Sequence, residues 1–234
     1  MNKAKKITVG LVMVLVLSLL TMSIVLAEPG NVTLAEGVNS RGTDLSLASI
    51  GAQAGNVTAL NVDQMRITTI WQGFYGNVSG EIVLENSNGQ NFYDWSFSTI
   101  QGEILATRDI IQDWTTLNCT NQSNMEDEEA TLNIEASDID GINDTFNSLS
   151  HPAFNITTVD FDANTCPSTR AYNSTEAGEF YNVALSHNKT SMVYVAIISD
   201  DKSAFSNSTA DFEILLPTDE DTGLATYYFY AELG

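Results

Sequence analysis

The sequence has few of the residues that carry most enzyme and metal chemistry. Its 234 residues include two histidines, two cysteines and nine basic residues. His151 and His187 lack the spacing to Cys119 and Cys166 that a zinc site requires. The chain has no Gly-x-Ser-x-Gly elbow, so nucleophilic hydrolysis has little support. We therefore expect no catalytic constellation and no cofactor, and predict that the protein is not an enzyme.

Basic residues are scarce beside the thirty acidic ones, and the formal net charge is −21. Three of the nine basic residues, Lys3, Lys5 and Lys6, precede residue 28. The rest of the chain therefore has six basic and thirty acidic residues, a net charge of −24. Such a surface repels nucleic acid and anionic lipid, which excludes both as partners. A solvated acidic surface is the simplest interpretation, and a salt-adapted host or scattered divalent-cation binding is the alternative.

Only one long apolar run is present, and it lies at the amino terminus. The three lysines precede an almost wholly apolar stretch from Ile7 to Ala27, which ends in the small-residue pattern of a cleavage site. This predicts a signal peptide over residues 1–27 and a mature chain from Glu28. An uncleaved anchor is the competing interpretation, because the run nearly suffices to cross a bilayer. Either way, membrane contact is expected only through this segment, and the rest faces outward.

Asparagine, in contrast, recurs in a modifiable context. Ten Asn-x-Ser/Thr triplets (sequons) without a central proline occur after residue 27, where chance would supply roughly four. Sequons are modified outside the cytoplasm and on accessible backbone, so the excess predicts a secreted or cell-surface glycoprotein. The predicted glycosylation sites are Asn31, Asn56, Asn77, Asn118, Asn121, Asn143, Asn155, Asn173, Asn188 and Asn207.

Two cysteines in an oxidising compartment most simply pair, which predicts a disulfide between Cys119 and Cys166. The bond would close a loop of about 48 residues and stabilise the fold by roughly 4 kcal/mol on the chain-entropy model. Asn118 directly precedes Cys119, so early closure of the disulfide competes with glycosylation of this sequon. Asn118 is therefore the weakest of the ten sites.

The pattern of the mature chain is mainly β. Residues 28–63 lack aromatic residues and are expected to form an extended arm, with Val57–Val62 compatible with a strand. Residues 64–234 predict a single antiparallel β-sandwich domain, because short strands alternate with turn signals. The first four strands are expected to form a meander, with turns at 73–76 and 86–89. The predicted strands are 65–71, 78–84, 92–97, 103–107, 179–186, 191–199, 210–216 and 225–233.

Two features refine this prediction. Met192–Ile198 is nearly all apolar, as expected of a central strand buried on both faces. Residues of about 113–170 are instead expected to form a disulfide-tied insertion with short helices. One helix is predicted near Met125–Glu129, capped by Ser123 or Asn124. A second is predicted near Ile139–Leu149, before Pro152.

The segment Asp138–Asp144 has acidic residues and a glycine at short spacing, which suits the oxygen ligands of calcium. It departs from the helix-loop-helix calcium pattern at the glycine and at the twelfth position, where Leu149 replaces a bidentate glutamate. Asx turns and helix caps are the alternative explanation. Paired carboxylates for glycoside cleavage are the other open alternative, although the abundance of acids prevents the choice of a pair.

Aromatic residues supply a further candidate site. Exposed rings would form a platform for stacking on sugars, whereas aromatics alternating on strands more commonly fill a core. We expect Trp71 and Trp95 to fill the core. The full candidate set is Trp71, Tyr75, Tyr93, Trp95 and Trp114.

Several short motifs resemble a group of uncharacterised, sequon-rich secreted archaeal surface proteins. The resemblance spans most of the mature chain and implies an archaeal cell-surface glycoprotein, without implying an activity, a cofactor or a catalytic residue. The motifs are 71–80, 91–95, 101–103, His151–Phe154, Cys166–Thr169 and Tyr227–Tyr230.

The sequence thus predicts a secreted or cell-surface, N-glycosylated structural protein. Its arm is expected to complete the sheet of a neighbouring copy by β-strand addition, giving a homo-oligomer or a surface assembly. In the alternative arrangement the arm pairs within its own sheet or serves as a tether. A carbohydrate-binding or adhesive module that uses the aromatics and acidic loops is the alternative function.

Overall fold

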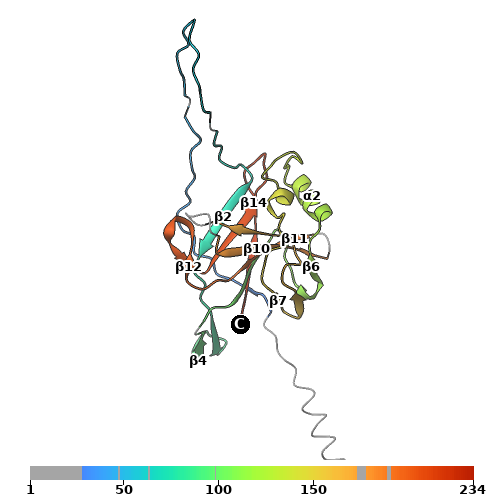
Figure 1. Cartoon of the computed structure of the whole chain (residues 1–234). Coiled ribbons are helices and arrows are strands. Elements are labelled where there is room, and N and C mark those ends of the chain that lie inside the picture. Colours follow the sequence, from blue (N-terminus) through green and yellow to red (C-terminus); the bar gives the residue numbers. More distant parts are fainter. Residues whose placement is uncertain (1–27, 47, 63, 98, 173–177, 189–190) are drawn as a thin grey trace, which may run out of the picture.

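The computed structural model describes residues 28–46, 48–62, 64–97, 99–172, 178–188 and 191–234. The predicted leader (1–27) and the sequon asparagine Asn173 lie outside these residues. The fold is mainly antiparallel β, with two layers of strands and short helices beside them, as the sequence predicted (Figure 1). The described chain contains no helix with the length and apolar character needed to cross a membrane.

Seven antiparallel strands form the main sheet of the described chain, in the order β1-β15-β5-β11-β10-β6, with β9 pairing β10 next to β6. The central strand β11 lies between β5 and β10, and Met192–Ala196 is buried on both faces. The predicted central strand is therefore confirmed. The bounds are β1 (Gly30–Asn31), β5 (Gly102–Thr107), β6 (Leu117–Cys119), β9 (Ser168–Ala171), β10 (Phe180–His187), β11 (Ser191–Ile197) and β15 (Tyr228–Leu233).

Alternation along the main sheet produces two apolar clusters, one on each face. On one face, Ala184 and Tyr194 pack with Ile214 and Leu216 of the second layer. That layer consists of β2 (Trp71–Gly76) paired with β14 (Phe212–Pro217). The helices α2 (Gln122–Thr131) and α3 (Ile142–Thr145) contribute Met125 and Ile142 to the same cluster.

The opposite face of the main sheet is covered by irregular chain and a small hairpin. Leu105, Val193 and Val195 pack there against Trp114 of the 3-10 turn η1 (Trp114–Thr116) and against Phe154. The hairpin pairs β7 (Phe154–Ile156) with β8 (Val159–Phe161). Burial of each fully enclosed aliphatic side chain stabilises the fold by about 1.5–3 kcal/mol, so the two clusters together hold the layers.

A buried asparagine joins the two sheets of the sandwich. Asn182 of β10 donates from Nδ2 to the carbonyl of Glu213 at 3.0 Å and accepts from the amide of Leu215 at 2.9 Å. Its side-chain amide therefore hydrogen-bonds to the backbone of β14 as a neighbouring strand would, and it links β10 to β14. Both of its polar ends are satisfied, which removes the cost of burying an amide.

The segment predicted as a glycine-bracketed turn is instead strand β2, and this prediction was wrong. Gly73 lies opposite Leu215, and Gly76 opposite Phe212, across the β2–β14 pair. A Cβ at Gly76 would meet the Phe212 ring at 3.7 Å, an ordinary van der Waals distance, so the packing does not require glycine here. Both glycines lie in a paired strand rather than in a turn. The predicted strand at 65–71 is likewise absent before Trp71.

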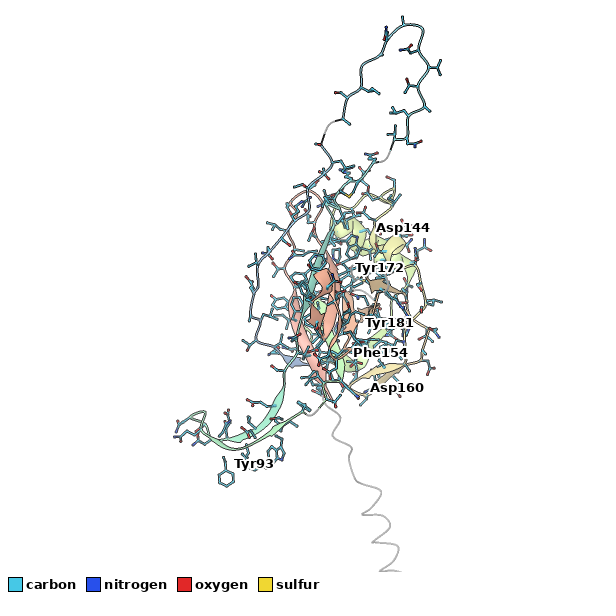
Figure 2. All side chains as sticks on the ribbon, turned by 60° about the vertical axis from the view of Figure 1, so that its left-hand side comes forward. Tyr93, Asp144, Phe154, Asp160, Tyr172 and Tyr181 are labelled. Carbon is cyan, nitrogen blue, oxygen red and sulfur yellow. A yellow bond between two sulfur atoms is a disulfide. The ribbon has the colours of Figure 1, made fainter. Side chains whose placement is uncertain are left out.

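The predicted meander is not formed, because its strands belong to three different sheets. The strands β3 (Glu81–Glu85) and β4 (Asn91–Ser96) pair only with each other in the described chain. They form a hairpin that projects from the body, called here the projecting hairpin (Figures 1 and 2). Its turn at 86–89 is confirmed: the amide of Gly89 donates to the carbonyl of Asn86 at 3.0 Å, and Gly89 has a φ of +72°.

The predicted insertion contains α2, α3, β7 and β8, and its two ends rejoin the main sheet as β6 and β9. The helix α2 begins earlier than expected, because its cap is Asn121, whose Oδ1 accepts from the amide of Asn124 at 3.0 Å. The second helix, α3, is one short turn. The predicted disulfide between Cys119 and Cys166 is confirmed, with the two Cα atoms 4.9 Å apart.

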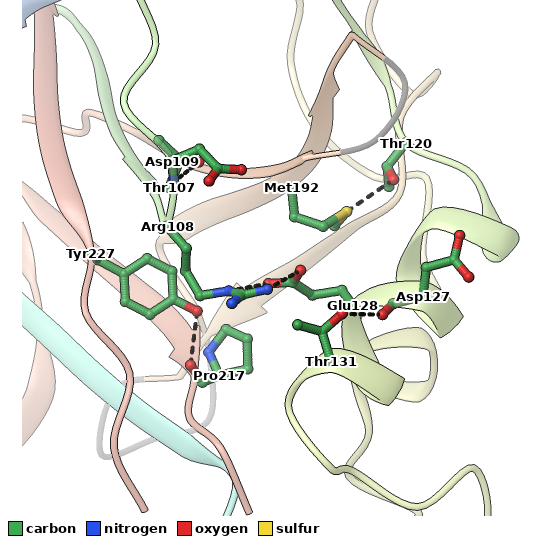
Figure 3. Close-up of polar contacts among 10 residues, drawn as sticks. All are labelled: Thr107, Arg108, Asp109, Thr120, Asp127, Glu128, Thr131, Met192, Pro217 and Tyr227. Atoms are coloured by element: carbon green, nitrogen blue, oxygen red, sulfur yellow. Dashed lines mark hydrogen bonds and ion pairs between the residues drawn. The ribbon is translucent and has the colours of Figure 1, made fainter.

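An ion pair fixes α2 to the end of β5. The Arg108 guanidinium donates to both carboxylate oxygens of Glu128, at 2.8 and 2.7 Å (Figure 3). Tyr227 lies beside the pair and donates from its hydroxyl to the carbonyl of Pro217 at 2.8 Å. Two parallel charge-assisted hydrogen bonds hold the planar guanidinium in one orientation, so this ion pair fixes the position of α2 relative to β5.

After β1 the chain runs outward into a long excursion that Figure 1 shows at the top of the molecule. Its described residues are 45–46, 48–62 and 64–66, and this segment is called here the projecting loop. Its base is closed by the amide of Ile67, which donates to Asp44 Oδ1 at 2.8 Å. Its tip is a turn in which the amide of Asn56 donates to the carbonyl of Gln53. The stretch Val57–Val62 is exposed and has no strand assignment.

The remaining elements lie near the start of β14. A two-stranded ribbon pairs β12 (Lys202–Ser203) with β13 (Thr209–Ala210), and the 3-10 turn η2 (Phe205–Asn207) connects them. Asp211 follows directly, and its carboxylate accepts from the amides of Val78 and Asp201 at 2.7 and 3.0 Å. This side chain ties the ribbon to the body.

Candidate functional site

A cavity of about 650 Å³ lies where β5 begins and β15 ends, beside β7. Glu103 of β5 and Glu232 of β15 are directly paired across the two strands. Side chains opposite each other in an antiparallel pair lie on the same face, with Cβ atoms roughly 5 Å apart. The two carboxyl groups therefore line one cavity, which Asp200 and Lys202 border as well.

Glu103 is a buried acid without a partner. It is only 7% exposed, and no hydrogen bond connects its carboxyl group to another described residue. Burial, and secondarily the charge of Glu232, raise the pKa of Glu103 from 4.5 to about 8. Desolvation disfavours the charged form of any acid, so Glu103 is mainly protonated at neutral pH. It can then donate a hydrogen bond into the cavity.

Glu232 lies in a different environment, although it is only 6% exposed. Both of its carboxylate oxygens accept from the amide of Thr157 at 2.9 Å. Burial raises the pKa of Glu232, the Thr157 amide opposes that rise, and the charge of Glu28 adds to it. The hydrogen bond favours the charged form, so the two acids differ: Glu103 holds a proton and Glu232 accepts one amide.

This pair was missed in the sequence, where thirty acids made any choice arbitrary. A signal was nevertheless present, because Glu103 stands in the apolar run Ile104–Ala106 and Glu232 follows the aromatic run 227–230. Acids within strands that are otherwise apolar are candidates for buried carboxyl groups. Chemically the cavity offers one proton donor and one carboxylate, with Phe154 and Leu233 among its apolar walls.

The sequon asparagines are distributed over the surface. Nine of the ten lie among the described residues, and eight of those nine have exposed side chains. Asn143, on α3, is half-buried, and its backbone N–H donates to Glu129 Oε1 at 2.8 Å. The exposed set is Asn31, Asn56, Asn77, Asn118, Asn121, Asn155, Asn188 and Asn207.

Two of these asparagines also have structural contacts. Asn121 caps α2 through Oδ1, whereas a glycan is attached at Nδ2, so the cap and the modification use different atoms. Asn118 lies in β6 beside the disulfide, and its Nδ2 donates to the carbonyl of Thr116 at 2.8 Å. Glycosylation of Asn118 would replace one of the two protons on Nδ2, the nitrogen that donates this hydrogen bond.

The aromatic candidates separate into buried and exposed residues. Trp114 is buried in the core, and Trp71 is half-buried against Phe146. Trp95 was expected in the core, and this was wrong: it is 50% exposed on the projecting hairpin, which no second layer covers. Tyr93 is 55% exposed beside it, with ring centroids 4.6 Å apart. Figure 2 shows Tyr93 pointing away from the body. Tyr75 contacts Phe205 instead.

The histidines have backbone contacts rather than catalytic ones. The Nε2 atom of buried His151 accepts from the amides of Thr165 and Cys166, at 3.1 and 2.9 Å, and its Nδ1 lies 2.7 Å from the carbonyl of Pro152. A carbonyl only accepts, so Nδ1 carries the proton and both ring nitrogens are engaged. His187 contacts the carbonyl of Asp113 through Nε2 at 3.0 Å.

The acidic segment before α3 forms two backbone turns, in which the amide of Asp138 donates to the carbonyl of Glu135 and the amide of Gly141 donates to the carbonyl of Asp138, at 2.9 and 3.1 Å. The Asp138 carboxylate also accepts from the amide of Glu135 at 3.2 Å, and the Asp140 carboxylate accepts from the hydroxyl of Thr68 at 2.6 Å. These carboxylates therefore have hydrogen-bonding partners, whereas α3 begins after Gly141 without a side-chain cap. The described residues place a different group of acids together, Asp200, Asp201 and Asp211, with oxygens within 4.8 Å. In that group Asp211 already accepts two backbone amides.

The chain was compared with protein-family models, with curated proteins and with solved structures, and nothing matched in any of the three. The function must therefore be inferred from the geometry of this chain.

Proposed function

We propose that this protein is a secreted or cell-surface structural glycoprotein that assembles with further copies of itself. The supporting observation is the accessibility of its sequons: eight of the nine asparagines described have exposed side chains, on strands, turns and the tip of the projecting loop. Accessible backbone is what N-glycosylation requires. The disulfide between Cys119 and Cys166 suits an oxidising compartment.

Assembly uses the projecting loop and an open sheet edge. In the loop, Leu60 and Val62 are 62% and 80% exposed. On the outer edge of β15, strand β1 pairs with Tyr230 and Ala231, so Tyr228 and Phe229 have an unpaired edge in the described chain. An unpaired edge accepts an extended segment by backbone hydrogen bonding. We assign the projecting loop of one copy to the β15 edge of the next.

The decisive experiment removes the projecting loop and leaves β1 in place. A chain lacking residues 46–64, with a Gly-Ser link, is compared with the full mature chain by light scattering at several concentrations. We expect the mature chain to form oligomers and the shortened chain to be monomeric. Identical masses for the two chains would refute assembly through the loop. A chain with Asn56→Gln, which has the loop without its sequon, separates the loop from its glycan.

The alternative is a carbohydrate-binding module, which the exposed ring pair Tyr93 and Trp95 favours. Sugars stack on exposed aromatic faces, and this pair lies on a hairpin directed away from the body. A glycan array probed with the mature chain and with Trp95→Ala tests it. Binding that is lost in Trp95→Ala, and retained in the matched surface variant Phe92→Ala, would favour this alternative over a purely structural role.

A further inference from the structure

The Glu103–Glu232 cavity contains a carboxylate, Glu232, that has no basic partner in the described chain. Its lining includes the protonated acid Glu103, the carboxyl groups of Glu232 and Asp200, and the exposed basic side chain of Lys202. Among the described residues, the ion pair found is Arg108 with Glu128, at another place in the fold. The nearly buried, unpartnered carboxyl group of Glu103 opens into this cavity. The site therefore suits a cationic hydrogen-bond donor.

The register of β1 brings a specific nitrogen near Glu232, on the outer edge of β15 and outside the residues that line the cavity. Gly30 pairs with Ala231 and Asn31 with Tyr230, so the same antiparallel register places Pro29 opposite Glu232. Pro29 is buried, and the negative charge of Glu28 contributes to raising the pKa of Glu232. From ordinary strand dimensions, the backbone nitrogen of Glu28 lies roughly 7 Å from the Cα of Glu232, which a glutamate side chain can largely span.

We propose that removal of residues 1–27 places the new α-ammonium group of Glu28 against Glu232, so that maturation provides a cationic partner for this carboxylate. This inference rests on the proposed function, and in particular on removal of the predicted signal peptide during secretion. In the unprocessed chain the same nitrogen is a neutral amide. In the processed chain it is a primary ammonium with three donors, and one of them faces a carboxylate that already accepts a single amide.

The titratable groups around this site set the expected pH dependence. They are Glu103 on β5, Glu232 on β15, Asp200 and Lys202 beside the β12 ribbon, and the Glu28 carboxylate itself. An ammonium group among these carboxylates is favoured in its charged form. The α-amino group should therefore titrate above its ordinary range of about 7.7–8.0.

Two chain forms test the pairing. The mature form begins at Glu28 and is released from a fusion by a protease that leaves no extra residue, and intact mass confirms the free amine. The extended form has Gly-Ser-Gly-Ser before Glu28, which moves the ammonium group away. The pKa of the α-amino group is measured by NMR in each form. We expect the mature form to lie about one pKa unit above the extended form.

The variant Glu232→Gln should return the α-amino pKa of the mature form to the ordinary range, whereas Glu81→Gln on the projecting hairpin should leave it raised. One unit of pKa corresponds to a tenfold change in the folding equilibrium constant. Urea unfolding at pH 7 should therefore favour the mature form about tenfold. If Glu232→Gln fails to fold, the two wild-type forms still decide the question. An ordinary α-amino pKa in the mature form overturns the pairing.

An amine from solution is the alternative cationic donor for the Glu232 carboxylate. Titration of n-butylammonium into the extended form, with n-butanol as the uncharged match, distinguishes the two. Binding of butylammonium together with an ordinary α-amino pKa in the mature form would overturn the assignment to Glu28. The two hypotheses fail separately: native protein that retains residues 1–27 contradicts the cleavage, whereas an ordinary pKa contradicts the pairing and leaves glycosylation untouched.

Discussion

Glu103 provides the sharpest test of the energetics, because its acid group is buried, unpartnered and opposite a second acid. The substitution Glu103→Gln preserves the shape of the side chain and removes its charge. Burial raises the pKa of Glu103 from 4.5 to about 8, with Glu232 as the secondary cause. The folded state therefore holds a proton that the unfolded state releases between these two pH values.

The sign and magnitude follow from that difference in pKa. Below about pH 4.5 both states are protonated, and the full stability is present. Between pH 4.5 and 8 the unfolded state binds fewer protons, so stability falls as the pH rises. A shift from 4.5 to about 8, at about 1.4 kcal/mol per pKa unit, gives a loss on the order of 5 kcal/mol by pH 9.

The assay is urea unfolding of the extended form at pH 4, 6, 7.5 and 9, with and without Glu103→Gln. The wild-type and variant midpoints should nearly coincide at pH 4 and separate at pH 9, where the variant is more stable. With a slope of about 2 kcal/mol per molar urea, the two midpoints should differ by about 2.5 M. Glu81→Gln, an exposed match on β3, should change stability by less than about 0.5 kcal/mol at every pH. Parallel curves for wild type and Glu103→Gln would refute the buried, protonated state of this acid.

Three further predictions concern stability. Replacing both disulfide cysteines with alanine should lower the free energy of unfolding by roughly 4 kcal/mol, measured by urea unfolding; no change would contradict the loop-closure account. Arg108→Met should cost about 2–3 kcal/mol, because it leaves the buried Glu128 carboxylate unpaired, and adding Glu128→Leu should restore most of that loss. A double variant as unstable as the single one would contradict this. Asn121→Gln should cost about 1 kcal/mol in unglycosylated protein through loss of the α2 cap, whereas Ser123→Ala, which removes the same sequon, should cost under about 0.5 kcal/mol. Equal losses in calorimetry would refute separate roles for Oδ1 and Nδ2.

The sequence predicted the carboxyl-terminal strands well because their signal is local. The apolar run Met192–Ile198 has to be buried on both faces, and that requirement alone places it at the centre of a sheet. The early strands were harder to predict, because β2, which contains Gly73 and Gly76, pairs with β14, about 140 residues away. Trp95 was placed in the core on its residue type, yet burial depends on a covering layer that the hairpin lacks.

The site was predicted only in part for the same reason. The disulfide followed from counting cysteines, since two of them allow one pairing. The Glu103–Glu232 pair depends on the register between β5 and β15, which are separated by more than a hundred residues. The residue types of Glu103 and Glu232 do not determine that register. The helix cap was predicted two or three residues too late, at Ser123 or Asn124, because Asn121 was interpreted as a sequon and was not considered as a cap as well.

The most direct test of the central claim, export followed by glycosylation, is intact mass with peptide mapping of protein purified from its native host. We predict a chain that begins at Glu28, with Cys119 linked to Cys166 and with glycans on most of the exposed sequon asparagines. An unmodified chain that retains Met1 and has both thiols free would contradict the account.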